Sequence, residues 1–202
     1  MGISGRVRRA ACAPVLLLVA GVLAACGSLW TPAPEAPAAA PAPASSTRAN
    51  PATRPPGASE ITIYLPRLFE DDSLGLQGVI RAVVPSADPV RDAIEALIRG
   101  PDGDERAADY QYALDRRTRV VNVRMESGTA TVELDEQIRR VHGRPFSELV
   151  YWSIVFTLTA VPGVERVALI QNGAPLAQLG DPPFTVPAAG TRAAAPAWAH
   201  PQ

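Results

Sequence analysis

Proline and alanine crowd both ends of this chain, and their distribution confines stable folding to residues 60–186. Eight prolines lie between residues 27 and 59, among alanine, serine and threonine with few charges. Such a stretch buries too little apolar surface to offset the entropy lost on ordering, and its prolines favour an extended spacer. We therefore expect a disordered Pro/Ala-rich linker over residues 26–59 and, for the same reason, a disordered tail over residues 187–202.

Residues 1–25 have the composition of a secretory signal. Three arginines precede an apolar run over residues 10–22, which is too short to span a bilayer stably. The run ends on Leu-Ala-Ala directly before Cys26, and this ending resembles the lipobox of bacterial lipoproteins. The resemblance implies cleavage before Cys26, acylation of that cysteine, and a lipid anchor at the extracytoplasmic face of the cell membrane. The alternative is an ordinary secretory signal in which Cys26 is incidental.

The charge and cysteine content of the mature chain exclude several classes of partner. Cys26 is the only cysteine left after cleavage, so no internal disulfide and no cysteine metal site can form. The mature chain has 16 basic residues, all arginine, and 20 acidic ones. This mildly acidic balance has no electrostatic footprint for nucleic acid and no polybasic stripe for anionic lipid. We expect membrane contact through the lipid alone.

The first half of the folded stretch predicts two strands and one helix. Alternating apolar and polar residues indicate strands over residues 60–65 and 76–84, with an acidic loop between them. Asp88 suits the N-cap position and Pro89 the first helical position. Apolar residues spaced by three and four then predict a helix that ends at Gly100.

The second half predicts a hairpin and a second helix. Residues 102–109 are polar and acidic, which is typical of a loop. Alternation predicts a hairpin of residues 120–125 and 129–134 with one buried face. We expect that face to contain Val121, Val123, Met125, Ala130, Val132 and Leu134. A nearly all-apolar helix follows over residues 145–160.

The chain closes with a strand over residues 164–170, a tight turn at Asn172 and Gly173, and a possible return strand over residues 174–179. The predicted order is therefore β-β-α-β-β-α-β(-β). This order is typical of a single α+β domain in which two helices cover a mostly antiparallel sheet.

Four segments resemble the sporulation and spore-germination (GerMN-type) domain. They are the Leu-Ile-Arg-Gly-Pro helix end at residues 97–101, the hairpin at residues 125–135, the Ile-Val-Phe-Thr-Leu-Thr helix at residues 154–159, and the closing strand and turn at residues 161–175. The similarity covers residues 61–179 in order. One departure lies at residues 113–118, which lack the proline and glycine that usually precede the hairpin in this family.

The resemblance implies a non-catalytic envelope module, often displayed on lipoproteins. Such domains are linked to germination or envelope assembly in spore formers, and to sensor kinases and wall homeostasis in actinobacterial lipoproteins. We therefore expect no enzyme activity and no cofactor. We expect a lipid-anchored binding or scaffolding module that contacts a membrane-protein ectodomain or a wall polymer through the sheet or the second helix.

Catalytic candidates are few. Only His142 and His200 could act as histidine bases or ligands, too few for a hydrolytic zinc site. The rival hypothesis is a peptidoglycan hydrolase that uses two loop carboxylates, since glycan cleavage needs only such a pair. The candidates are Glu70, Asp71, Asp72, Asp102, Asp104 and Glu105. We expect these groups to be solvated loop charges instead, because neither cluster has apolar flanking residues that would raise an acid pKa.

Two groups of side chains are candidates for contact with a partner. One is the aromatic set Tyr151, Trp152 and Phe156 on the second helix, because aromatic residues anchor interfaces. The other is the basic set Arg139, Arg140 and Arg144. The alternative interpretation is that the aromatic residues belong to the core and that the arginines lie on a solvated loop.

Overall fold

A computed structural model describes residues 57–141 and 143–201. The chain divides into two units, residues 1–41 and 42–202, and every described residue belongs to the second unit. The signal, Cys26, the linker up to residue 56 and His142 lie outside the described residues.

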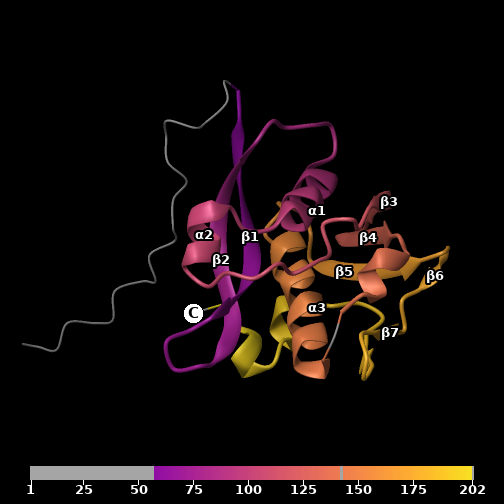
Figure 1. Cartoon of the computed structure of the whole chain (residues 1–202). Helices are drawn as coiled ribbons and strands as arrows, with labels where there is room; N and C mark the ends of the chain where they lie inside the picture. The colour runs from indigo at the N-terminus through magenta and orange to yellow at the C-terminus, as the bar shows by residue number, and fades with distance from the viewer. Residues whose placement is uncertain (1–56, 142, 202) are drawn as a thin grey trace, which may run out of the picture. The chain divides into compact units, whose positions relative to one another are not determined.

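The described part is an α+β domain, as predicted (Figure 1). Strands β1 (Ser59–Leu68) and β2 (Leu74–Val83) form a hairpin, and β3 (Val120–Glu126), β4 (Thr129–Leu134), β5 (Arg166–Gln171) and β6 (Ala174–Pro175) form a four-stranded sheet. A small hairpin joins β7 (Gln178–Leu179) to β8 (Phe184–Thr185). The helices are α1 (Pro89–Arg99), α2 (Gly103–Ala107) and α3 (Arg144–Leu158), with short 3-10 turns η2 (Glu136–Arg139), η3 (Arg192–Ala194) and η4 (Ala197–Ala199).

The two larger sheets are separate, because no described strand of one pairs with a strand of the other. Pairing is antiparallel except between β4 and β5, which run parallel on either side of α3 in the sequence. Helices α1 and α3 contact both sheets, so the core lies between them. All buried core side chains lie between Ala58 and Ala199. This part of the chain therefore carries its own hydrophobic core.

Helix α3 covers the outer edge of β1 through two hydroxyl groups one turn apart. The backbone N–H of Tyr64 donates to Thr157 Oγ1 at 2.9 Å, and Ser153 Oγ donates to the Tyr64 carbonyl oxygen. Both hydroxyl residues are fully buried. Polar residues in an otherwise apolar helix thus satisfy backbone groups that the hairpin leaves unpaired.

We expect Thr157→Val to lower the free energy of unfolding by about 2 kcal/mol, because the substitution keeps the side-chain shape but leaves the buried Tyr64 N–H unpaired. Urea unfolding of residues 27–202 measures this change. Thr131→Val is the matched control, since Thr131 is a partly exposed sheet residue, and we expect a change within about 0.5 kcal/mol. Equal effects of the two variants would contradict the prediction.

Helix α1 begins and ends where the sequence predicts. Asp88 accepts a hydrogen bond from the Arg91 N–H at 3.0 Å, and Pro89 is the first helical residue. At the other end Gly100 has a φ of 70°, and a Cβ there would overlap the Tyr112 ring. Only glycine meets both requirements at low energetic cost.

Residues 102–109 are not simply a loop, and that prediction is wrong. They contain α2, which begins with a capping box between Asp102 and Glu105. The side chain of Asp102 accepts from the Glu105 N–H, and the side chain of Glu105 accepts from the Asp102 N–H, both at 2.9 Å. A helix of this length is too short to show a period in the sequence, so it was identifiable only by its cap.

The hairpin β3–β4 was predicted, but its buried face is only partly as expected. Ala130, Val132 and Leu134 are buried, whereas Val121 is 57% exposed and Met125 is 44% exposed. The register shifts between Val120 and Asn122, so Val120 lies opposite Leu134 and Val121 is the extra residue of a bulge. Met125 lies at the far end of β3, an edge strand, where fewer elements cover it.

The C-terminal segment differs most from expectation. The turn at Asn172 and Gly173 is confirmed by its positive φ angles of 51° and 73°. The predicted disordered tail, however, packs on the domain as far as residue 201. Gly190 exchanges two backbone hydrogen bonds with Val167, at 2.9 and 2.8 Å, and Ala199 is fully buried. The composition of this segment predicts disorder, but a few specific contacts hold it against the domain.

Candidate interaction surfaces

The aromatic residues of α3 are core residues. Tyr151, Trp152 and Phe156 are 0%, 5% and 2% exposed. Tyr151 lies 4.9 Å from Trp152 between ring centroids, and Phe156 lies 5.5 Å from Tyr64. Burial raises the pKa of Tyr151 to about 12, because desolvation disfavours the phenolate. The prediction that these three residues contact a partner is therefore corrected, and the core interpretation holds.

The arginines of the basic set lie near residues 115–119, a segment that no sequence pattern links to them. Arg139 and Arg140 are exposed, and Arg139 Nε donates to Gln171 Oε1. Arg144 is the first residue of α3, and its side chain lies outside the described residues. The backbone N–H of Asp135 donates to the Arg119 carbonyl oxygen at 3.1 Å, and this bond joins residues 115–119 to the segment before Arg139.

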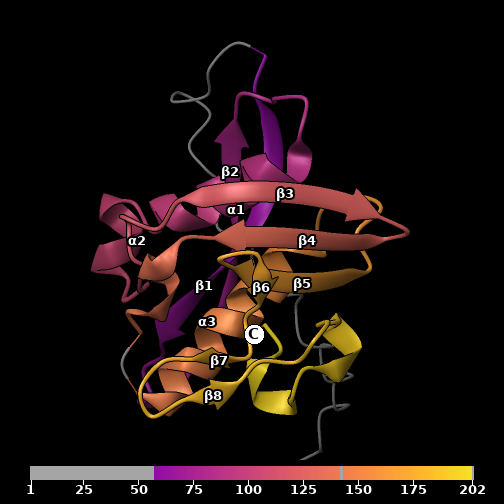
Figure 2. The same cartoon turned by 90° about the vertical axis from the view of Figure 1, so that its right-hand side faces the viewer.

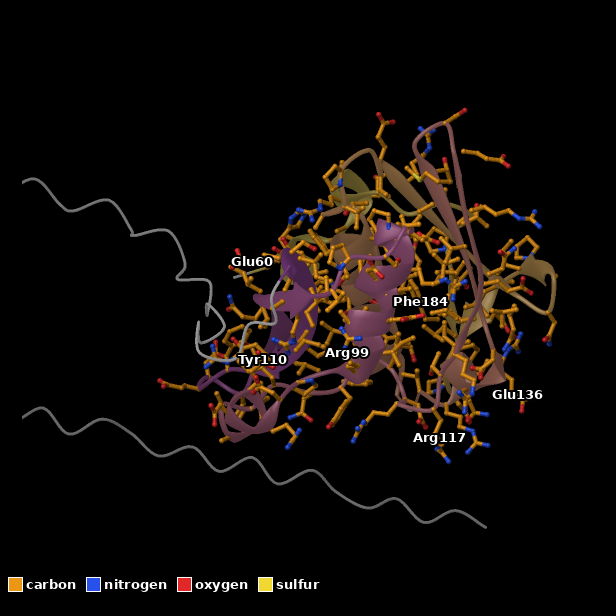
Figure 3. The ribbon with its side chains drawn as sticks, turned by 90° about the horizontal axis from the view of Figure 1, so that it is seen from above. Glu60, Arg99, Tyr110, Arg117, Glu136 and Phe184 are labelled. Atoms are coloured by element: carbon orange, nitrogen blue, oxygen red, sulfur yellow. The ribbon has the colours of Figure 1, made fainter. Side chains whose placement is uncertain are left out.

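Acidic side chains are mixed into this corner of the domain. Arg117 Nη2 contacts Asp115 Oδ2 at 2.6 Å, and Arg117 holds the pKa of Asp115 at about 2, with a smaller contribution from Arg140. Figure 3 places Arg117 and Glu136 on the same side. The Asp115 carbonyl also accepts from the Thr118 N–H at 2.8 Å, which closes the turn in the segment lacking the family's proline and glycine. Partner contact by the arginines stays a prediction.

The acidic clusters are engaged in local structure. Asp71 accepts hydrogen bonds from the backbone and hydroxyl of Ser73, and these bonds lower its pKa. Asp102 caps α2, and Glu105 pairs with Arg81. A general acid for glycan cleavage needs a raised pKa, the opposite of the shift at Asp71. Among the described residues, no group of three or more His, Cys, Asp or Glu could hold a metal ion.

The Arg81–Glu105 ion pair joins three elements that lie apart in the sequence. Arg81 Nη1 donates to Glu105 Oε1 at 2.6 Å, and Nη2 contacts both Glu105 Oε2 and the Gly100 carbonyl oxygen, the latter at 3.2 Å. The Arg81 side chain is 16% exposed and that of Glu105 6% exposed. One guanidinium therefore joins β2, the end of α1 and α2. No local sequence signal links residues this far apart.

The four-stranded sheet has one covered face and one open face. The covered face holds Ala130, Val132, Leu134, Val167 and Leu169, all buried. Figure 2 shows β3, β4 and β5 in front of α1 and α3, with the opposite face toward the viewer. By alternation and register, this open sheet face consists of Asn122, Arg124, Glu126, Thr129, Thr131, Glu133, Arg166, Ala168 and Ile170.

The open sheet face carries both positively and negatively charged side chains. A hollow of about 110 Å³ is lined by Asn122, Arg124, Thr131, Glu133, Ile170 and Gly173. Glu133 is held in place because Oε1 accepts from the Gly173 N–H at 2.8 Å, and Arg166 Nε donates to Thr129 Oγ1 at 3.1 Å. Two arginines and two glutamates thus stand among hydroxyl and amide groups, a surface suited to a polar partner.

No helix among residues 57–141 and 143–201 is long and apolar enough to cross a membrane.

Comparison with solved structures supports the fold assignment. The tandem GerMN domains of the sporulation protein GerM from Bacillus subtilis align with a TM-score of 0.52 at 22% identity, covering 71% of this chain and 49% of that chain. The chain therefore spans about half the length of that solved chain. The first GerMN domain of the same protein aligns with a TM-score of 0.52 at 18% identity, covering 66% of this chain and 98% of that chain.

A search of curated proteins found no match. The family model described as Germane, sporulation and spore germination, matches residues 62–177, which are more than half of the chain. The match falls on the segments whose motifs resembled this family, and it confirms the resemblance. The chain belongs to the Germane (GerMN) sporulation and spore germination family.

Proposed function

We propose that this chain is a lipid-anchored, non-catalytic cell-envelope module that binds an envelope protein or a wall polymer through its open sheet face. The observation that carries the proposal is the contrast between α3, whose aromatic residues are buried, and the open sheet face, on which Arg124, Glu126 and Arg166 are exposed. A binding role within envelope assembly, sporulation or germination, or sensor-kinase signalling follows from the family alone.

The anchor is the second part of the proposal. The lipobox-like ending before Cys26 and the Pro/Ala-rich stretch after it support a domain tethered at the extracytoplasmic face of the cell membrane. Two or three acyl chains on Cys26 would hold it there, since each buried methylene contributes about 0.8 kcal/mol. A spacer before residue 57 would let the domain reach a partner away from the bilayer.

Site-specific photo-crosslinking in cells tests the binding surface. A photoreactive residue at Thr131 of the full chain is expected to capture a distinct envelope protein or wall fragment. The same residue at Glu95, an exposed position on α1, serves as the matched control and is expected not to capture it. Arg124→Ala should reduce capture at position 131, and Cys26→Ala should abolish it while releasing the chain from the membrane. Identical products at both positions would contradict the proposal.

The competing peptidoglycan hydrolase has its own assay. The purified chain is incubated with peptidoglycan, and soluble fragments are measured by chromatography. We expect no release. Fragment release that disappears in Asp71→Asn or Asp104→Asn, two exposed carboxylates, would overturn the non-catalytic part of the proposal.

A further inference from the structure

The outer edge of β2 carries backbone groups whose direction the structure fixes. In an antiparallel ladder, two kinds of residue pair alternate. In the first kind the two residues are hydrogen-bonded to each other, and in the second kind their N–H and C=O groups point away from the partner strand. Both backbone groups of Tyr64 bond to α3, so Tyr64 and its partner Gly78 form a pair of the second kind. By alternation, Ile80 and Ala82 also direct their backbone groups away from β1.

No described strand or loop pairs with these outward groups, because β1 is the only described strand beside β2. Figure 1 shows β1 between β2 and α3. Gly78, Ile80 and Ala82 are partly exposed, whereas Leu76 is fully buried, and η4 contacts β2. The open edge therefore runs from Gly78 to Ala82.

This edge lacks several of the features by which monomeric proteins protect an exposed strand. Residues 78–82 contain no proline, no lysine and no bulge, and Val84 just beyond them is 67% exposed. The one charged side chain, Arg81, points inward, which would itself disfavour pairing, but Glu105 neutralises its charge. An edge with so little protection is a template for pairing with another strand.

We propose that the outer edge of β2 binds a second copy of this chain, with the two β2 strands antiparallel about a two-fold axis at Ile80. In this register Ile80 lies opposite Ile80 of the second copy, and Gly78 lies opposite Ala82. Each of the three residues then donates and accepts one backbone hydrogen bond.

Chemistry favours a second copy over an unrelated strand. Every cross-strand pair formed by the outward residues is uncharged and small or β-branched, so like charges do not oppose one another. Two hairpins would join into one four-stranded sheet, which removes the open edge from both copies. The open sheet face belongs to β3, β4 and β5, so this contact is independent of the proposed partner surface.

Charge exchange at residue 80 tests the two-fold register. Ile80 is outside the packed core, so polar substitutions leave folding intact. Sedimentation velocity of residues 27–202, which contain the whole described core, is expected to show a monomer–dimer equilibrium. Ile80→Lys and Ile80→Glu should each raise the dimer Kd at least about tenfold, because residue 80 faces itself. Mixing the two variants should restore a heterodimer, since opposite charges then meet.

Two controls accompany this test. Glu95→Lys, an equally exposed charge change on α1, should leave the dimer Kd unchanged. Ala82→Pro removes one outward N–H but no hydrogen bond between β1 and β2. It should therefore weaken the dimer while leaving the hairpin intact. A wild-type chain that stays monomeric at millimolar concentration would overturn the proposal. So would lysine and glutamate variants that dimerise like the wild type, or that fail to pair when mixed.

Discussion

Replacement of Glu105 by alanine is expected to lower the free energy of unfolding by about 3 kcal/mol, the largest effect of a single polar substitution in this domain. The change leaves the guanidinium of Arg81, only 16% exposed, without its carboxylate partner. It also removes the acceptor for the Asp102 N–H at the start of α2. Urea unfolding of residues 27–202, followed by circular dichroism, measures the loss.

A double-mutant cycle separates the ion pair from the rest of the effect. Arg81→Met alone leaves the Glu105 carboxylate without its partner, and we expect it to destabilise the domain to a similar degree. The double variant Arg81→Met, Glu105→Ala should be more stable than either single variant, because no unpaired charge stays buried. Glu95→Ala, which breaks an exposed pair with Arg91 at 3.6 Å, is the control and should change stability by less than about 0.5 kcal/mol. A Glu105→Ala effect as small as that control would refute the structural role.

Local pattern sufficed for the elements with a clear period or cap. Helix α1 has an N-cap aspartate, a proline and a terminal Gly100, each of which acts on its immediate neighbours. Strands β1 to β5 alternate over enough residues to be recognised. For the same reason the order of elements and the α+β class could be predicted, since hairpins and their covering helices follow one another along the chain.

Local patterns could not predict contacts between segments that lie far apart in the sequence. Helix α2 has only five residues, too few to show a period, and it is stabilised by Arg81 from the distant strand β2. The bulge at Val121 depends on how β3 meets β4, and it exposes a valine that alternation alone would bury. Parallel pairing of β4 with β5 likewise requires knowledge of where α3 returns the chain.

The candidate surfaces divide in the same way. The polar side of the β3–β4 hairpin was visible as alternation, and it forms most of the open sheet face. The aromatic residues of α3 could not be assigned from the sequence, because an apolar helix surface looks the same whether a sheet or a partner covers it. Here β1, β8 and the C-terminal segment cover it, and the last of these had been predicted to be disordered.

Truncation after residue 189 is therefore expected to destabilise the domain by about 4 kcal/mol, whereas removal of a disordered tail would change stability by less than about 0.5 kcal/mol. Arg192 accounts for much of the difference. It donates to the Phe156 carbonyl and to Thr159 Oγ1, both at 2.7 Å, at the C-terminal end of α3, where a cation is favoured. Its guanidinium carbon also lies 5.3 Å from the ring centres of Tyr64 and Phe156.

Gly190 adds a close contact that truncation would also remove. A Cβ at this position would overlap the hydroxyl of Tyr151, so the tail reaches the core only through a glycine. Comparison of residues 27–189 with residues 27–202 in urea unfolding measures the total effect. Arg192→Ala in the longer chain should lose about 2 kcal/mol, and Ala193→Ser, at the exposed neighbouring position, should lose almost nothing. Equal stability of the two chain lengths would mean that the segment does not pack in solution, and Tyr151 and Phe156 would again become candidates for a partner surface.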